Sequence, residues 1–225
     1  MATRDQLLLD LEREPALGRE DFLPAPGNRE ALAWIDRWPD WPATALVLHG
    51  PEGAGKTHLA RIFAARSNGR RLGPGDLAAD APPQLPPALV LDPAVPVADE
   101  VALLRLYNRQ RAQGGHLLLT ARHPAAHWPL ALPDLASRLR AAPSVGIATP
   151  DDGLLAALLV KLFADRQLTV GDEVVMYLVR HMERSFAAAR SLVAALDRHS
   201  LIQHKPVTVA MARRLLHESD PEQQK

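Results

Sequence analysis

The stretch Gly50-Pro51-Glu52-Gly53-Ala54-Gly55-Lys56-Thr57 fits the phosphate-binding pattern G-x-x-x-x-G-K-[ST]. The preceding residues 44–49 are apolar and partly β-branched, which predicts a buried strand, and residues 57–67 predict the helix that follows. Glycines let several backbone N–H groups converge on one anion, and the helix N-terminus adds its dipole. We therefore expect a loop that binds nucleotide phosphates, with Lys56 at the β- and γ-phosphates and the Thr57 hydroxyl on Mg²⁺. The alternative is an ordinary glycine-rich turn, which would not require the lysine and the hydroxyl at these positions.

The composition provides enough apolar residues for a sizeable core, since 47% of the 225 residues are hydrophobic. The 26 basic residues equal the 26 acidic ones, and the two signs also balance within residues 1–150 and within residues 151–225. No segment has the basic excess of a module that binds DNA mainly through its phosphates, so we expect no strong direct DNA binding. The sequence contains no cysteine, no signal-like segment and no membrane-spanning run. These features predict a cytoplasmic protein without a membrane partner.

Three parts follow one another along the chain. Residues 1–20 are polar around a short leucine cluster, and we expect them to form an N-terminal tail. Residues 21–150 alternate strand-like and helix-like segments, which predicts an α/β domain whose parallel sheet is covered on both faces. After Pro150 the pattern becomes helical, so we expect residues 151–225 to form a small all-helical domain. The expected strands are 44–49, 70–72, 88–92, 116–121 and 144–148, and the expected helices are 28–38, 57–67, 98–112, 152–165, 172–182, 185–199 and 208–217.

The strand Ala88-Leu89-Val90-Leu91-Asp92 ends in a carboxylate, and this arrangement places an aspartate beside the Mg²⁺ of a phosphate-loop enzyme. Apolar strands followed by aspartate also occur by chance, so the assignment of Asp92 depends on the phosphate loop. The next residue is Pro93, at a position where many such ATPases carry a glutamate that activates water. Proline cannot accept a proton. We therefore expect a site that binds nucleotide well and hydrolyses it weakly.

Two further groups of residues favour structural interpretations. His123 and His127 have the spacing of a zinc pair, but Pro124 prevents a regular helix there, so we expect them to be loop residues. Trp34, Trp38 and Trp41 cluster in sequence near the first helix, where packing against the sheet is favoured over recognition of a base.

Five segments together resemble the DnaA branch of the AAA+ family: the loop GPEGAGKT, the strand LVLDP, Leu106-Tyr107-Asn108-Arg109, Leu117-Leu118-Leu119-Thr120 and Leu132-Pro133-Asp134-Leu135-Ala136-Ser137-Arg138-Leu139. Within that branch, segments 106–109 and 132–139 most resemble the Hda family of replication regulators. The resemblance covers nearly the whole chain. It implies an α/β AAA+ nucleotide-binding domain over residues 21–150, an all-helical lid domain over residues 151–225, and ADP or ATP with Mg²⁺ as cofactors.

The resemblance also implies roles for single residues. Asn28 matches the segment on the adenine side of the nucleotide, Thr120 the first nucleotide sensor, and Arg190 the second sensor on the lid. Arg138 matches the arginine finger, a catalytic residue that acts in trans, and Asp92 would be catalytic at the chain's own site. Without the resemblance, these arginines could equally be solvated or ion-paired, and Arg138 would also suit the dipole of a short helix. The other cofactor contacts fall in the loop, at Gly50, Pro51, Gly53, Ala54, Gly55, Lys56 and Thr57.

The tail contains Gln6-Leu7-Leu8-Leu9-Asp10-Leu11, which resembles the QLxLxL peptide that binds the sliding clamp of DNA polymerase III. In such a peptide alternate leucines fill pockets and the glutamine amide pairs with backbone groups, so Gln6, Leu7, Leu9 and Leu11 would contact the clamp. The alternative is an N-terminal strand or helix start whose leucines belong to the core.

Together these resemblances imply a regulator of bacterial replication initiation. Such a protein, held on the clamp, contacts the initiator DnaA and promotes hydrolysis of the ATP bound there. After the expected lid helices only a polar end remains, so we expect no helix-turn-helix domain for origin DNA. A second possibility is a clamp-associated adaptor or loader that uses nucleotide as a conformational switch. An autonomous ATPase motor is a third, which Pro93 disfavours, and a homo-oligomer is possible.

Overall fold

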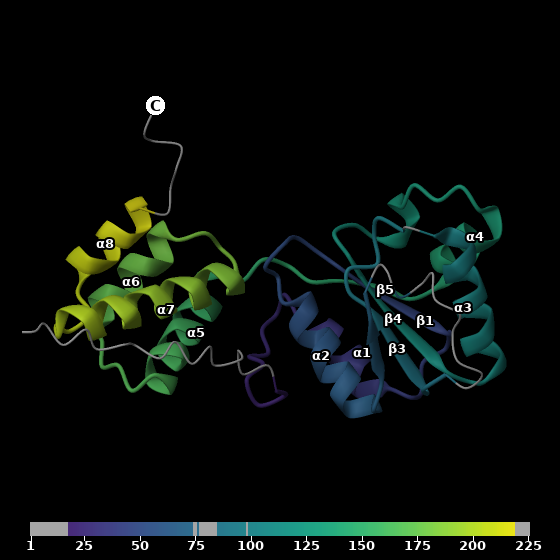
Figure 1. Cartoon of the computed structure of the whole chain (residues 1–225), viewed down its shortest axis with the longest axis horizontal. Coiled ribbons are helices and arrows are strands. Elements are labelled where there is room, and N and C mark those ends of the chain that lie inside the picture. Colours follow the sequence, from purple (N-terminus) through teal and green to yellow (C-terminus); the bar gives the residue numbers. More distant parts are fainter. Residues whose placement is uncertain (1–17, 74–75, 77–84, 98, 219–225) are drawn as a thin grey trace, which may run out of the picture.

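The computed structural model describes residues 18–73, 76, 85–97 and 99–218. We call residues 18–150 the body and residues 151–218 the lid. Figure 1 shows them side by side, with the sheet in the body and only helices in the lid. The body contains α1 (Arg29–Arg37), β1 (Ala45–His49), α2 (Lys56–Ser67), β2 (Arg70–Leu72), β3 (Ala88–Leu91), α3 (Glu100–Ala112), β4 (His116–Ala121), the 3₁₀ turn η2 (Ala125–His127), α4 (Pro133–Ala141) and β5 (Ser144–Gly146). The lid contains α5 (Asp152–Asp165), α6 (Asp172–His181), α7 (Phe186–Gln203) and α8 (Val209–Glu218).

The five strands of the described residues form one parallel sheet in the order β2-β3-β4-β1-β5. β1 is therefore flanked by β4 and β5, with Leu48 opposite Thr120 and also opposite Val145. Because all strands run the same way, their carboxyl ends meet at one edge, where ligands bind in open α/β sheets. The expected α/β fold with a parallel sheet and a helical lid is confirmed.

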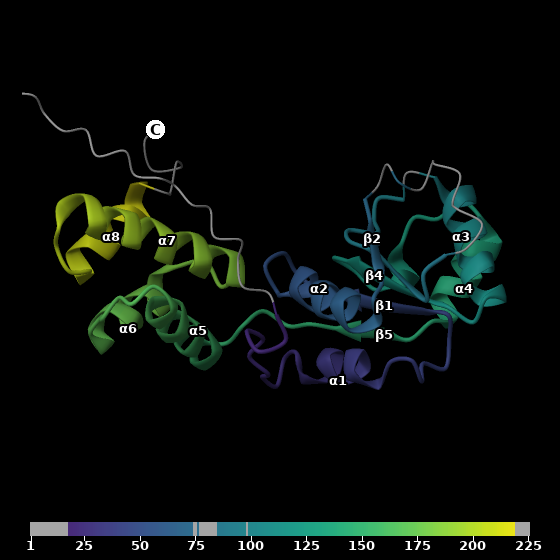
Figure 2. The same cartoon turned by 60° about the horizontal axis from the view of Figure 1, so that its bottom comes forward.

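Successive side chains of each strand point to opposite faces of the sheet, so the core of the body has two layers. Leu46, Leu48 and Val90 face α1 and α2, whereas Val47 and Leu89 face α3 and α4. Figure 1 and Figure 2 show these two helix pairs on opposite sides of the sheet. Strands buried on both faces are continuous apolar runs, which is why they could be recognised in the sequence.

The tryptophans near α1 pack inside the body, as predicted. Trp41 stacks on Phe63 of α2 with 4.9 Å between ring centroids, and Trp38 meets the same ring edge-on at 5.9 Å. The Trp41 indole N–H donates to the Trp34 carbonyl at 2.7 Å. This cluster supports the start of β4, where His116 contacts both Trp38 and Trp41, and it is remote from the carboxyl edge of the sheet.

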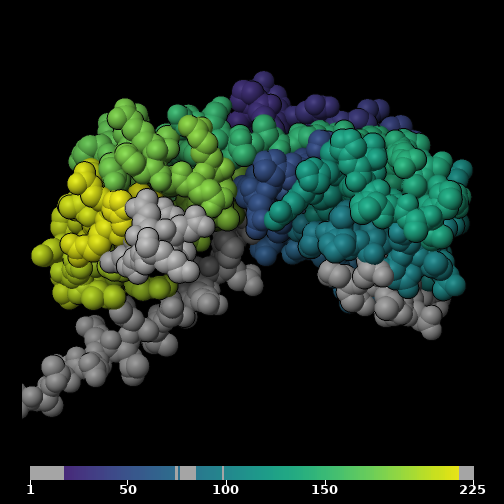
Figure 3. Space-filling view, turned by 90° about the horizontal axis from the view of Figure 1, so that it is seen from above, coloured from purple at the N-terminus to yellow at the C-terminus, as the bar shows by residue number. Residues whose placement is uncertain are grey.

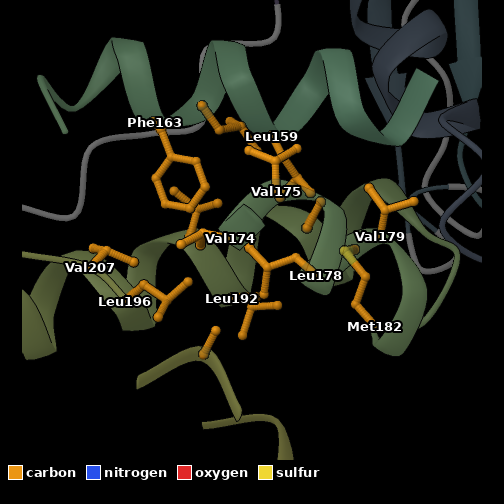
Figure 4. Close-up of a cluster of buried hydrophobic side chains, with 14 of the residues drawn as sticks. Leu159, Phe163, Val174, Val175, Leu178, Val179, Met182, Leu192, Leu196 and Val207 are labelled. Carbon is orange, nitrogen blue, oxygen red and sulfur yellow. The ribbon is translucent and has the colours of Figure 1, made fainter. Parts of the chain in front are cut away.

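The lid has its own apolar core. Figure 4 shows Leu159 and Phe163 of α5 facing Val174 and Leu178 of α6, with Leu196 of α7 beneath them. Local caps define where its helices begin. The Asp151 carboxylate accepts from the Leu154 N–H at 2.8 Å, and the Ser185 hydroxyl accepts from the Ala188 N–H at 3.0 Å. Among the helices that the structure describes, none is both long and apolar enough to cross a membrane.

Three histidines of the body are buried or partly buried. His58 on α2 is hydrogen-bonded to the Gly18 carbonyl at 3.0 Å, and His116 packs edge-on against Trp41 at 5.4 Å. His49 ends β1. Burial lowers the pKa of all three below the ordinary value, because the charged imidazolium loses hydration there.

These histidines make the free energy of unfolding depend on pH. Their folded pKa lies below the unfolded value of about 6.5, so their contribution is fully present above that pH and is lost as pH falls below it. We expect urea unfolding to show declining stability from pH 7 to pH 5, by up to about 1.4 kcal/mol per pH unit for each proton taken up. His116→Leu should reduce this slope, and His217→Gln, at an exposed position on α8, is the control. A flat profile, or an unchanged slope in His116→Leu, would contradict the assignment.

Candidate functional site

A cavity of about 800 Å³ opens at the carboxyl edge of the sheet. Its walls come from the loop after β1, the ends of β3 and β4, the segment before α1, and the lid helices α5 and α7. Figure 3 shows the body and the lid as two lobes that touch in the middle of the molecule. The volume lies within the range of about 300–1,000 Å³ that is usual for small-molecule and cofactor sites.

The loop between β1 and α2 has the backbone of a phosphate cradle. Gly53 and Gly55 have φ angles of 71° and 99°, in the left-handed region that favours glycine. The Lys56 ammonium lies inside the loop and donates to the carbonyls of Gly50 at 2.8 Å and Pro51 at 2.7 Å. Burial lowers the pKa of Lys56, while nearby Asp92 opposes that shift. A phosphate arriving at the loop would meet this amine and the N-terminus of α2 together.

The phosphate loop is also in direct contact with the lid. The Phe186 N–H donates to the Gly53 carbonyl at 3.0 Å. A Cβ at Gly53 would lie 2.2 Å from the Cβ of Ser185, the residue that caps α7. Glycine is thus required at position 53 both by its backbone conformation and by the close approach of the lid. The start of α7 is thereby joined to the loop that would hold the phosphates.

Asp92 and Thr120 meet at the ends of β3 and β4. The Thr120 hydroxyl is fully buried and donates to Asp92 Oδ1 at 2.5 Å. Arg71 on β2 donates to the other carboxylate oxygen at 3.3 Å. Pro93 follows Asp92 and also lines the cavity, where it offers no ionisable group.

Each carboxylate among the described residues that line the cavity already has a partner. Asp21 accepts from Lys161 of the lid at 2.7 Å, and this hydrogen bond lowers the pKa of Asp21. Glu52 is ion-paired with Arg122, in an exposed pair that contributes little energy. Asp92 has the two partners described above. None of these three carboxylates is therefore a free base that could activate water.

Part of the cavity lining is apolar. Phe22 and Leu23 approach from the segment before α1, and Leu158 and Phe186 approach from the lid. Asn28 does not line the cavity, since its side chain is 3% exposed and is used within that segment. It accepts from the Ala25 N–H at 2.8 Å and donates to the Leu23 carbonyl at 3.0 Å. Asn28 therefore shapes the segment that presents Leu23, and this apolar surface suits a flat base.

The two arginines assigned from the resemblance lie in different places. Arg190 on α7 lines the cavity, where burial lowers its pKa and Asp21 opposes that shift. Arg138 on α4 lies outside this cavity. Its guanidinium binds Asp134 through two hydrogen bonds of 2.9 and 3.1 Å, and it lies 5.6 Å from the centroid of the Tyr107 ring. The hydrogen bonds to Asp134 raise the pKa of Arg138.

The cavity therefore collects most of the predicted cofactor residues. Those that line it are Gly53, Gly55, Lys56, Thr57, Asp92, Thr120 and Arg190. Gly50, Pro51 and Ala54 belong to the loop behind this surface, and Gln6, Leu7, Leu9 and Leu11 lie outside the described residues. His123 and His127 are in irregular structure and the short turn η2, as expected for loop residues, and both line the cavity. The described residues contain no cluster of three or more possible metal ligands.

Several residues that line the cavity, or that contact a lining residue, were not found by sequence reasoning. Phe22 and Phe186 are aromatic residues close to the ends of expected helices, a signal too common to single them out. Arg71 and Lys161 act through ion pairs that bridge 21 and 140 residues of sequence. Such pairs depend on the order of the strands and on the position of the lid. Local sequence patterns predict neither of these.

Magnesium fits the cavity in part. The Thr57 hydroxyl lines the cavity next to the phosphate loop, where an Mg²⁺ bound to a nucleotide could reach it. Asp92 is less available, because both of its oxygens already accept hydrogen bonds.

Comparison with known proteins gives a family match for the lid and structural matches for the fold. The model of the family described as "Hda, lid domain" matches residues 151–216. Domain III of the replication initiation protein DnaA from Thermotoga maritima superposes with a TM-score of 0.79 at 15% identity, covering 91% of this chain and 97% of that one. DnaA from Aquifex aeolicus, in a structure bound to AMPPCP, gives 0.70 at 13% identity, with 91% and 70% covered.

A branch-migration motor has the same fold with a lower score. The RuvB protein of Thermotoga maritima gives a TM-score of 0.61 at 14% identity, covering 78% of this chain and 61% of that one. A search of the curated proteins gives no match. The fold is that of AAA+ proteins, and the lid is of the Hda type.

Proposed function

Because this chain is a DnaA-related AAA+ protein that resembles Hda, we propose that it regulates bacterial replication initiation. In this proposal it binds an adenine nucleotide, docks on the sliding clamp and promotes hydrolysis of the ATP bound to DnaA. One observation carries the proposal: the cavity has a complete phosphate loop, but each of its described carboxylates is already paired, while Arg138 lies outside it.

Nucleotide binding is supported by two parts of the cavity lining. Lys56 and the N-terminus of α2 supply positive charge for the phosphates, and Phe22 and Leu23 supply an apolar surface for the base. Arg190 can approach the phosphates from the lid. Thr57 would hold an Mg²⁺ that accompanies the nucleotide, and that ion would offset phosphate charge. Either ADP or ATP is compatible with this arrangement.

Weak intrinsic hydrolysis is supported by the residues beside Asp92. Activation of water requires a base within hydrogen-bond reach, and Pro93 supplies none. Asp21 and Glu52 are engaged by Lys161 and Arg122. In this proposal the protein therefore keeps its nucleotide and acts on the nucleotide of another molecule.

Arg138 is the residue proposed to act on DnaA. Its planar and permanently charged guanidinium suits the charge that develops on a transferring phosphoryl group. Tyr107 and Asp134 hold the guanidinium at the surface of α4, away from the chain's own cavity. A neighbouring molecule docked on this face would receive the arginine in trans.

One observation also favours the alternative of a nucleotide-switched adaptor. The hydrogen bond from the Phe186 N–H to the Gly53 carbonyl joins the phosphate loop to α7. Nucleotide that rearranges the loop would change the position of the lid. In the adaptor hypothesis, partner binding would depend on nucleotide while Arg138 would be dispensable.

Lys56→Ala should weaken nucleotide binding strongly. Charged hydrogen bonds contribute about 1.5–3 kcal/mol each, so loss of the ammonium should raise the dissociation constant by roughly 10- to 100-fold or more. Binding of a fluorescent adenine nucleotide measures this, and Lys205→Ala, at an exposed lid position, is the control. Unchanged affinity in a folded Lys56→Ala protein would contradict the phosphate-loop assignment.

Arg138→Ala should leave binding of nucleotide and clamp intact and remove stimulation of DnaA. Arginine fingers contribute roughly 10³–10⁵ to the rate in well-studied phosphoryl-transfer systems. Single-turnover hydrolysis of labelled ATP on DnaA, with DNA-loaded clamp, gives the readout. Arg140→Ala, an exposed arginine on the same helix, controls for loss of surface charge. Full stimulation by Arg138→Ala would favour the adaptor hypothesis.

Replacing Gln6 and Leu7 by alanine should eliminate clamp binding without changing the melting temperature, because a tail adds little to the core. A clamp pull-down measures the loss of binding, and thermal melting measures the stability. Arg4→Ala/Asp5→Ala, just before the peptide, is the matched control. Retained binding, or a large fall in melting temperature, would show that these residues have a structural role.

A further inference from the structure

Arg71 lies where its positive charge offsets the negative charge of Asp92. It lies on the edge strand β2 and is paired in register with Val90, two residues before Asp92. Its guanidinium therefore reaches the carboxyl edge of the sheet, where Nη2 lies 3.3 Å from Asp92 Oδ2. The side chain of Arg71 is 40% exposed, whereas that of Asp92 is 7% exposed. The ion pair is thus formed by a largely buried carboxylate and a cation that reaches it from the surface.

The carboxylate of Asp92 is shared among three groups. Oδ1 accepts the Thr120 hydroxyl at 2.5 Å, and Oδ2 accepts Arg71. The charge of Asp92 is also felt by Lys56 inside the phosphate loop. The negative charge of Asp92 therefore already faces two cations, Arg71 and Lys56, when neither nucleotide nor metal is bound. An Mg²⁺ that used Asp92 as a ligand would have to displace Arg71 or bring two more positive charges beside it.

We propose that Arg71 replaces much of the charge balance that Mg²⁺ provides in a phosphate-loop site, so that nucleotide binding here depends little on the metal. Without a counterion, a buried carboxylate beside the phosphate loop repels the nucleotide phosphates, and a bound metal relieves that repulsion. Arg71 relieves it from the protein side. Arg71 is therefore a positioning residue that keeps Asp92 neutralised, and Thr57 remains able to contact a nucleotide-bound metal. The proposal rests on the nucleotide binding proposed above.

The test is the ratio of ADP dissociation constants measured with EDTA and with excess Mg²⁺. For the wild-type protein this ratio should be close to one. For Arg71→Ala it should rise to roughly tenfold or more, because a unit charge a few ångströms away at an effective dielectric constant near 20 is worth at least that much. Arg70→Ala, the exposed neighbour on β2, is the control and should behave like wild type.

Two further variants separate charge balance from a structural role. Arg71→Lys should keep the ratio low because it retains the cation. In Arg71→Ala/Asp92→Asn the repelling charge is removed, so the ratio should fall back towards one, which loss of packing alone would not produce. A strongly metal-dependent wild-type protein, or an unchanged ratio in Arg71→Ala, would overturn the proposal.

A nucleotide-free measurement distinguishes this inference from the proposed function. Titration of the protein with Mn²⁺, followed by electron paramagnetic resonance, should show tighter binding to Arg71→Ala than to wild type, because Asp92 is released. Addition of Asp92→Asn should abolish the gain. If wild-type protein fails to bind ADP even with Mg²⁺, the nucleotide function fails, and equal Mn²⁺ binding by wild type and Arg71→Ala would refute the role of Arg71.

Discussion

β1 lies between β4 and β5, and this parallel pairing decides where the body's part of the site can form. Leu48 is level with Thr120, so the phosphate loop that leaves β1 begins beside the end of β4. β3 pairs with the other side of β4 and ends just before Asp92. Residues that are far apart in the sequence are thereby brought to one edge by the pairing of the strands. Side-chain chemistry then acts on a geometry that the sheet has already fixed.

The second requirement is contact between the loop and the lid. Gly53 supplies both the left-handed turn and the carbonyl that accepts from Phe186, while Ser185 caps α7 at the same point. Lys161 adds an ion pair to Asp21 on the other side of the cavity. The apolar part of the cavity lining is shared between the body and the lid. A site of this kind can report bound nucleotide through the position of α7, whether the output is a partner contact or an arginine delivered in trans.

Sequence patterns predicted the elements well because their causes are local. Buried parallel strands are continuous apolar runs, and side chains such as Asp99 mark helix starts. The expected strand 144–148 ends early, at Gly146, because the Ala148 N–H leaves the ladder and bonds to Gly27. The helix expected at 185–199 continues to Gln203, where His204 adopts a left-handed conformation. The partners of Asp92 could not be predicted, since they depend on which strands become neighbours.

In the proposed function, the surroundings of Arg138 would hold this arginine in place while no target is bound. Its two hydrogen bonds to Asp134 keep the guanidinium extended on α4, and the Tyr107 ring lies against it. Asp134 is 57% exposed, so this pair gains little net energy from the contact. A phosphate group on a docked neighbour carries more negative charge than a carboxylate and offers the same forked geometry. In the proposed function, exchange of Asp134 for that phosphate would be favourable only when the neighbour's nucleotide is in place, so that Arg138 would act only on a nucleotide-bound partner.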